Sequence, residues 1–370
     1  MERNHPRALD ARSAAALLFA ASAGLGATDA LAGDVKVTEN RAGVRVKGSA
    51  TADEMYVYPG MTAGEFRIVA GADTTINGAS ETTVALSGSD TFFVDGGRGD
   101  DVISLAGASF RGNVTLSGGA GNDRVHLTSG GFMRNVKLLG GSGDDFLDQT
   151  GNSAIDGALR LDGGNGRDTL SAASSTFNGR VDMDGGSDAD LLRMDHALCR
   201  GRLAVDGGAG ADSLTVMNST ALAGAQVSGG SDDDSVNFMF VTFPKGATVR
   251  GDAGDDQLFV TQSLSGSSLT IDSGSGDDRA TLYGANLTDK LRYDGGSGND
   301  QFDLFTNDVG GEALLVAGSG NDRIYVTQVH FRKKATFDGG RGTDTLVGSS
   351  SNTFDGTNPV KGFETKIDGM

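Results

Sequence analysis

The stretch Gly118-Gly119-Ala120-Gly121-Asn122-Asp123-Arg124-Val125-His126-Leu127 decides the fold, because its pattern recurs about every 22 residues. Each copy holds a hexapeptide of the form Gly-Gly-x-Gly-x-Asp (the glycine loop), followed by alternating apolar residues. The steps between its final aspartates are 22, 22, 23 and then eight more of 22. The twelve aspartates are Asp101, Asp123, Asp145, Asp168, Asp190, Asp212, Asp234, Asp256, Asp278, Asp300, Asp322 and Asp344. Such a fixed period predicts one coil per repeat and one stacked column of aspartates.

Apolar residues alternate with polar ones on both sides of each glycine loop, which predicts two half-buried strands per coil. One apolar column stands two residues after each aspartate, and another stands just before each loop. A third, looser column holds Phe110, Phe132, Phe177, Cys199, Phe243, Leu287, Val309 and Phe331. The 23-residue step predicts one bulged residue near Asn152, which lets Ile155 fill that column. We therefore expect an all-β fold: a right-handed parallel β-helix of about 12 regular 22-residue coils plus degenerate N-terminal coils.

The N-terminus is typical of a bacterial secretory signal peptide. Arg3, Arg7 and Arg12 precede an apolar run, and Ala30-Leu31-Ala32 offers a cleavage site before Gly33. The run is too short to favour a membrane anchor. We expect cleavage after residue 32 and an extracellular, periplasmic or cell-surface location.

The mature chain divides into three expected parts. Residues 33–93 read as an N-terminal cap with degenerate coils, in which Gly48 to Asp53 resembles a worn glycine loop. Residues 94–348 form the regular array. Residues 349–370 break the pattern and read as a C-terminal cap, with Phe354, Val360 and Phe363 folding over the last coil.

Composition excludes several classes of partner. The net charge of −18 and a pI near 4.5 argue against nucleic acid, and they argue against anionic membrane surfaces. No segment of the mature chain favours membrane insertion. The single cysteine, Cys199, excludes an intrachain disulfide, and its place in the third column predicts a buried, inert thiol.

A column of bare carboxylates would be unstable. Neighbours one coil apart repel by roughly 1 kcal/mol in water and by several-fold more where they are partly buried. The carboxylates must therefore be protonated, or cations must lie between them. Calcium takes six to eight oxygen ligands, and glycine-rich turns can direct backbone carbonyls toward a shared point.

The pattern Gly-Gly-x-Gly-[Asn/Asp]-Asp-x-φ, where φ is apolar, resembles the hemolysin-type calcium-binding nonapeptide of the repeats-in-toxin (RTX) proteins. Clear copies occupy residues 118–125, 140–147 and 295–302, and the residue before the last aspartate is Asp or Asn in eight of the twelve loops. The resemblance implies Ca²⁺ held between loops of successive coils by loop carbonyls and by the terminal aspartates. The twelve aspartates are then candidate metal ligands, with up to about eleven sites.

This chain departs from the family because thirteen or fourteen other residues follow each nonapeptide. We therefore expect a wider coil with calcium along one edge only. Some loops are also imperfect: Asp188 and Asp232 replace the third glycine, Asp252 replaces the second, and Ser273 and Ala317 replace the first. Asp tolerates the left-handed conformation, whereas the effect of the other replacements on nearby sites is open.

We expect a secreted calcium-binding protein with a structural or binding role and no catalytic site. The rival hypotheses are a β-helix polysaccharide lyase or epimerase, with His196 and His330 as weak candidates, and a surface adhesin. The four histidines occupy different coil positions and are expected to be solvated. Basic residues gather on the turn before the second strand of several coils, where we expect a solvated edge that blocks aggregation. The alternative is a groove for acidic polysaccharide, which makes an extracellular polysaccharide or cell-surface glycan a candidate partner. The basic residues are Arg111, Arg134, Arg180, Arg200, Lys245, Arg332, Lys333 and Lys334.

Overall fold

The computed structural model describes residues 33–87, 90–262, 264–265 and 267–367. The expected signal peptide lies outside the described residues, so its cleavage stays a prediction. The described residues contain 43 strands and no helix, and hence no helix that could cross a membrane.

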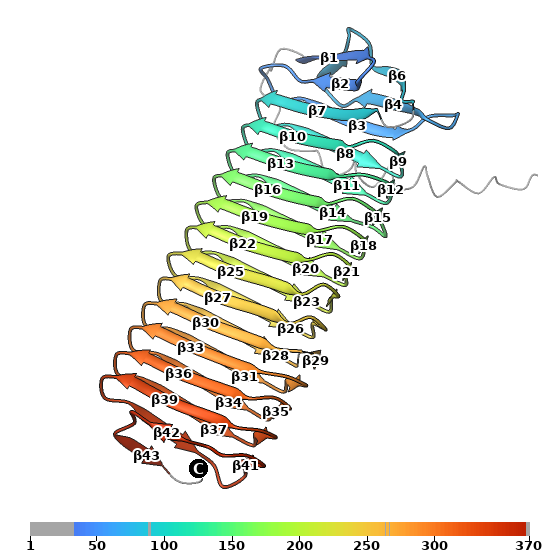
Figure 1. Cartoon of the computed structure of the whole chain (residues 1–370). Coiled ribbons are helices and arrows are strands. Elements are labelled where there is room, and N and C mark those ends of the chain that lie inside the picture. Colours follow the sequence, from blue (N-terminus) through green and yellow to red (C-terminus); the bar gives the residue numbers. More distant parts are fainter. Residues whose placement is uncertain (1–32, 88–89, 263, 266, 368–370) are drawn as a thin grey trace, which may run out of the picture. The chain divides into compact units, whose positions relative to one another are not determined.

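Most of the described chain is a parallel β-helix whose coils each contribute one strand to a first sheet and one to a second (Figure 1). The first sheet consists of β1 (Gly33–Asn40), β2 (Gly43–Lys47), β5 (Thr74–Ile76), β7 (Thr91–Arg98), β10 (Val114–Ala120), β13 (Val136–Ser142), β16 (Leu159–Asn165), β19 (Val181–Ser187), β22 (Leu203–Ala209), β25 (Ala225–Ser231), β27 (Ala247–Ala253), β30 (Leu269–Ser275), β33 (Leu291–Ser297), β36 (Ala313–Ser319), β39 (Ala335–Arg341) and β42 (Val360–Lys361).

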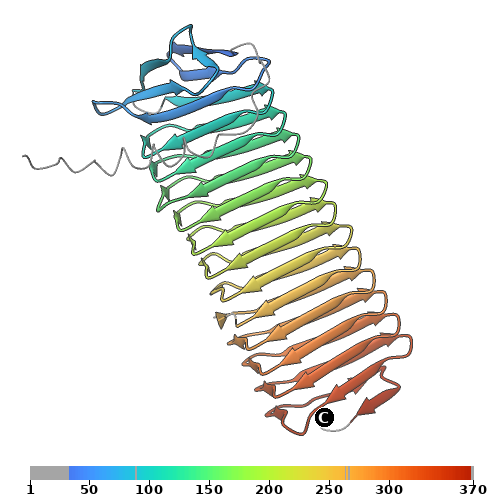
Figure 2. The same ribbon diagram turned by 180° about the vertical axis from the view of Figure 1, so that it is seen from behind.

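The second sheet lies behind the first and is seen from the other side in Figure 2. It consists of β3 (Glu54–Pro59), β4 (Glu65–Ala70), β6 (Glu81–Ala85), β8 (Val102–Ala106), β11 (Arg124–Thr128), β14 (Phe146–Thr150), β17 (Thr169–Ala173), β20 (Leu191–Asp195), β23 (Ser213–Met217), β26 (Ser235–Met239), β28 (Gln257–Thr261), β31 (Arg279–Tyr283), β34 (Gln301–Phe305), β37 (Arg323–Thr327), β40 (Thr345–Gly348) and β43 (Thr365–Ile367).

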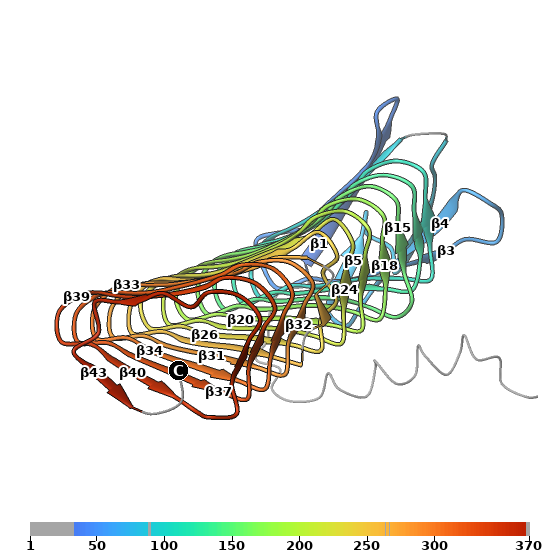
Figure 3. The same ribbon diagram turned by 60° about the horizontal axis from the view of Figure 1, so that its bottom comes forward.

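A third, two-residue strand closes most coils, and Figure 3 shows β15, β18 and β24 one after another along one edge of the stack. These strands form a six-stranded and a five-stranded sheet. The six are β9 (Ser109–Phe110), β12 (Gly131–Phe132), β15 (Ala154–Ile155), β18 (Thr176–Phe177), β21 (Leu198–Cys199) and β24 (Thr220–Ala221). The five are β29 (Leu264–Ser265), β32 (Asn286–Leu287), β35 (Asp308–Val309), β38 (His330–Phe331) and β41 (Thr353–Phe354). The structure thus confirms a solenoid of about twelve regular turns, with a third short strand that the sequence did not predict.

The predicted apolar columns stack in register and form the core. Leu116 of β10 pairs with Val94 and Leu138 of its neighbours, while Val125 of β11 pairs with Ile103 and Leu147. All of these side chains are fully buried. Because side chains alternate between the two faces of a strand, each sheet buries one face against the other and exposes its second face.

The third column also follows the prediction. Ile155 pairs with Phe132 and Phe177, and the extra residue is absorbed where Gly151 and Asn152 both adopt positive φ. Cys199 is fully buried between Phe177 and Ala221. Burial raises the pKa of its thiol to about 12, so the inert role predicted for Cys199 is consistent with its surroundings.

The N-terminal region differs from the expected run of degenerate coils. Only β2 and β3 continue the parallel stack onto β7 and β8. The pairs β1 with β2 and β3 with β4 are antiparallel hairpins, and β6 also pairs antiparallel with β4. Phe66 and Ile68, whose spacing resembles that of a coil strand, belong to one of these hairpins and are buried. An inserted hairpin caps the sheets, because a coil without a preceding neighbour leaves its edge unpaired.

The C-terminal segment continues the stack rather than folding across its end. Strands β41, β42 and β43 pair in parallel with β38, β39 and β40. Phe354 stacks on Phe331 with ring centroids 5.2 Å apart, and Phe363 is buried. The residues expected to form a cap therefore form a last, irregular coil.

Truncating the third column should destabilise the fold strongly. Phe132→Ala removes a side chain that is 1% exposed, and we expect a loss of about 3–5 kcal/mol in the free energy of unfolding. Met133→Ala, which truncates a neighbour that is 60% exposed, serves as the control and should change stability by no more than about 0.5 kcal/mol. Denaturant unfolding in excess calcium measures both, and equal losses would contradict the assignment of this column to the core.

Candidate metal centre

The glycine loop turns the chain from a first-sheet strand into a second-sheet strand, and its glycines have two separate tasks. In the loop that ends at Asp123, Gly119 and Gly121 have φ of 118° and 129°, a region that favours glycine. The imperfect loops keep this conformation, because Asp188, Asp232 and Asp252 adopt φ of 75°, 80° and 78°. The first glycine, Gly118, has no such φ and is needed for another reason.

The first glycine is needed because there is no space for a side chain at its position. A Cβ there would be directed into the coil, toward the aspartate that ends the same loop. A Cβ built at Gly96 would lie within 3.0 Å of Asp101 Oδ2 and of the carbonyl oxygen of Gly118 in the next coil. The same two kinds of oxygen meet beside Gly140, Gly163, Gly185, Gly207, Gly229, Gly251, Gly295 and Gly339. The missing Cβ thus leaves a small cradle between a carboxylate and a carbonyl of successive coils.

The twelve aspartates predicted from the repeat form one column of buried carboxylates. Each is at most 3% exposed. One oxygen, Oδ1, accepts a hydrogen bond from the backbone N–H of the aspartate one coil earlier, at 2.7–3.0 Å. The carboxylates therefore hold successive coils in register through the backbone.

The second oxygen, Oδ2, is buried and has no hydrogen-bond partner in any of the twelve aspartates. An unsatisfied buried acceptor costs about 1–3 kcal/mol, and more when it is charged. Twelve such atoms would cost more than the net stability of about 5–15 kcal/mol that is typical of a folded domain. A hard cation fits here, because the converging donors are all oxygen atoms.

Two further residues extend this series of hydrogen bonds, the buried Asp53 at one end and the exposed Glu364 at the other, and both were missing from the set predicted from the repeat. Asp53 is fully buried, and its N–H donates to Asp101 Oδ1 at 2.7 Å. At the other end, Asp344 N–H donates to Glu364 Oε2 at 2.7 Å. The strands inserted after Asp53 lengthen its distance from Asp101 to 48 residues. A search for aspartates at the 22-residue period therefore misses Asp53. The worn loop at Gly48 to Asp53, followed by alternating Met55 and Val57, was the available signal.

Comparison with known protein families matches residues 111–131 and 336–354 to the RTX calcium-binding nonapeptide repeat (4 copies). These segments contain or border the loops that end at Asp123 and Asp344. The glycine loops are RTX calcium-binding repeats. Searches of curated proteins and of solved structures found no match. RTX repeats bind Ca²⁺, and the stacked, buried aspartates of this chain are consistent with calcium-binding loops.

Burial in the RTX column raises the carboxyl pKa values. The pKa is raised to about 6 for Asp123, Asp168, Asp212, Asp256 and Asp322, to about 7 for Asp145, Asp190, Asp234 and Asp278, and to about 8 for Asp101 and Asp300. Desolvation is the largest cause throughout, partly offset by the hydrogen bond that Oδ1 accepts. Without a cation, much of the column therefore holds protons near neutral pH.

A second ladder on the outside of the RTX loops explains the preference for Asp or Asn before the last aspartate. Asn122 N–H donates to Asp100 Oδ1, and Asp144 N–H donates to Asn122 Oδ1, both at 2.8 Å. This ladder spans eight steps at 2.7–3.0 Å. It is interrupted where the position is Arg167, Ala189 and Ala211. The outer Asp and Asn side chains therefore link neighbouring turns, a role that is separate from the inner column.

No group of three or more His, Cys, Asp or Glu side chains in the described residues is placed to hold a metal jointly. This agrees with a site in which Oδ1 of each aspartate already binds a backbone N–H, so that loop carbonyls must supply further ligands. The histidines lie apart. His126 is only half-buried, not fully solvated as predicted, and packs against Asp148 and Phe146. His330 lies 2.9 Å from Asp355.

The metal-free protein should lose stability as the pH rises. The unfolded carboxyls ionise near 3.8, whereas the folded ones ionise at about 6 to 8. Between these values the folded state binds more protons, so the free energy of unfolding falls with pH. Calcium requires the deprotonated form, so saturating calcium should weaken or reverse the trend. Melting temperatures from about pH 5 to about pH 8, in EDTA and in calcium, measure this; a metal-free melting temperature that rises with pH would contradict it.

Proposed function

We propose that this chain is a secreted, calcium-loaded β-helix with a structural or binding role, in which Ca²⁺ lies between successive glycine loops along one edge. The observation that carries the proposal is the unpartnered Oδ2 of every aspartate in the column. The terminal aspartate of one loop and the first carbonyl of the next would hold each ion. When bound, calcium supplies the positive charge that offsets the buried carboxylates.

The twelve regular loops offer up to about eleven sites. Asp53 and Glu364 would add one gap at each end of the series. Ser273 and Ala317 should reduce calcium binding, because each places a Cβ in the space that the first glycine leaves open in the other loops. The gaps that follow Asp278 and Asp322 should therefore be the weakest sites.

Secretion is supported by the RTX repeats, which are typical of secreted proteins, and by the signal-like N-terminus. Calcium outside the cytoplasm would then drive folding, because the free energy of metal binding becomes free energy of folding. The N-terminal sequence of the exported protein tests cleavage after residue 32.

The rival function is a β-helix polysaccharide lyase or epimerase. The specific observation in its favour is an Asp–His pair, since His196 Nδ1 lies 2.6 Å from Asp195 Oδ1. Against this function, Asp195 also forms an ion pair with Arg193. We propose that Asp195 holds the His196 side chain in position for binding and does not transfer protons. Incubation with alginate or polygalacturonate, followed by ultraviolet detection of unsaturated products, separates the two proposals.

Removing calcium should lower the melting temperature by on the order of 10 °C or more, because several sites each contribute and 1 kcal/mol shifts the midpoint by roughly 2–4 °C in a large domain. The far-UV circular dichroism should change with it. The measurement is a thermal melt of protein stripped with EDTA, with calcium removal verified by elemental analysis. An unchanged melt in verified metal-free protein would overturn the proposed function.

Restoring a cradle should strengthen calcium binding. Ala317→Gly removes the Cβ that fills the cradle beside Asp322, so more calcium should bind at subsaturating concentrations. The matched control is Ala280→Gly, which alters an alanine that is also buried but lies outside the glycine loops. Both variants lose about 0.5–1 kcal/mol from added backbone freedom, but only Ala317→Gly should raise the calcium content measured by equilibrium dialysis. An equal calcium content in the two variants would contradict the role assigned to the first glycine.

A further inference from the structure

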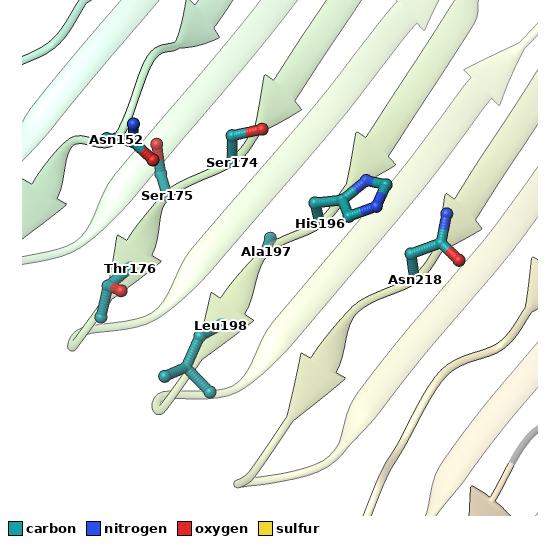
Figure 4. Close-up of a pocket in the computed structure, with 8 residues that line it drawn as sticks. All are labelled: Asn152, Ser174, Ser175, Thr176, His196, Ala197, Leu198 and Asn218. Atoms are coloured by element: carbon teal, nitrogen blue, oxygen red, sulfur yellow. The ribbon is translucent and has the colours of Figure 1, made fainter.

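A polar pocket lies at the corner where second-sheet strands lead into the short third strands, away from the glycine loops. It is a shallow, largely open depression of about 430 Å³. Figure 4 shows the residues that line it: Asn152, Ser174, Ser175, Thr176, His196, Ala197, Leu198 and Asn218. Four successive coils thus contribute amides, hydroxyls and one imidazole to a single depression.

Three of these residues, Ser174, His196 and Asn218, directly follow a second-sheet strand, and Asn152 follows its strand after the extra residue Gly151. Their φ values are 49–57°. The same conformation recurs at Gly107, Ser129, Phe240, Gln262, Gly284, Thr306 and Gln328, and these eleven residues are here named the corner column. Glycine adopts it most readily, and Gly107 and Gly284 show that glycine is sufficient. Residues other than glycine adopt this positive φ only at a cost in conformational energy, and such strained residues cluster at functional sites.

Phe240 is the clearest case. It follows Asn218 by one coil, has φ of 54° and is 54% exposed. A bulky residue in this conformation is a genuine outlier, and burial does not account for its retention. Two coils further, Tyr283 ends strand β31 beside Gly284 and is 43% exposed. Exposed aromatic rings therefore continue the line of the polar pocket along the same corner.

Two polar side chains of the pocket, His196 and Asn218, are held in place by one network. Asp195 Oδ1 contacts His196 Nδ1 at 2.6 Å and accepts a hydrogen bond from Asn218 Nδ2 at 3.1 Å. Asp195 Oδ2 accepts one from Arg193 at 2.9 Å. The network fixes the imidazole and the amide of neighbouring coils, and pre-positioned polar groups of this kind are what binding sites require.

We propose that this corner binds a neutral glycan, with about three successive sugars along the pocket from Asn152 to Asn218 and the following sugars stacked on Phe240 and Tyr283. The proposal rests on the proposed binding role of the chain. Sugars offer hydroxyls to amides and imidazoles and apolar ring faces to aromatic side chains. Coils are spaced by roughly 4.8 Å, which is close to the length of one pyranose. The net charge of −18 disfavours polyanionic chains.

The test is a binding assay of the full, calcium-loaded chain against laminarin, mannan, cello-oligosaccharides and chito-oligosaccharides, with alginate and polygalacturonate as acidic probes. We expect saturable binding to at least one neutral glycan. Phe240→Gly and Asn218→Ala should each weaken it at least ten-fold. The matched control is Thr306→Gly, which makes the same kind of substitution in the same column beyond the proposed site, and it should leave affinity unchanged. Phe240→Gly should not lower the melting temperature, because glycine fits its conformation.

Several results would overturn the proposal: no binding to any neutral glycan, binding to the acidic probes alone, or equal weakening by Thr306→Gly and Phe240→Gly. A lower melting temperature of Phe240→Gly would assign that ring a packing role and would also overturn it. Calcium is held constant throughout, and the EDTA melt is measured separately. A chain that melts in a calcium-dependent manner but binds no glycan therefore overturns the glycan site and leaves the calcium proposal standing.

Discussion

The structure depends on one interaction, the bond between a buried aspartate and the backbone of the coil before it. Through Oδ1 each carboxylate satisfies a buried N–H that would otherwise lack a partner. In nine of the twelve loops, Oδ2 of the same carboxylate lies beside a carbonyl of the coil after it. These aspartates thus relate three successive coils, and the negative charge that secures one contact creates the need for a cation or a proton at the other. Coil register and metal dependence have a single origin.

The different positions of the glycine loop follow from this arrangement. The second and third glycines supply a backbone conformation, which Asp can also adopt, so Asp188, Asp232 and Asp252 are tolerated there. The first glycine supplies volume, which no other residue can provide, so Ser273 and Ala317 alter the cradle even though the backbone accommodates them. The residue before the aspartate supplies an external hydrogen bond, which the stack survives losing at Arg167, Ala189 and Ala211.

Much of the fold could be read from the sequence, because a strict period converts a local pattern into a column. The two apolar columns, the bulge near Asn152, the buried Cys199 and the stacked aspartates all follow from spacing alone. Asp53 and Glu364 escaped because the antiparallel hairpins and the irregular last coil break the period. The corner column escaped for a different reason: its residues share a backbone conformation and no chemistry, so Ser, His, Phe and Gln at one position show no pattern in the sequence.

The contrast between the two ends of a second-sheet strand explains how such a repeat can carry specificity. At the loop end the aspartate is kept in every regular coil, because exchanging it would strand a buried N–H and disturb the register of its neighbours. At the corner end the backbone conformation is set by the turn, and the coil tolerates strain because the loop end already fixes it. The side chain at this corner can therefore be Asn, His or Phe in successive coils without altering the stack. The constant aspartate at the loop end thus allows the corner residue to vary, and binding sites can be carried on a common fold in this way.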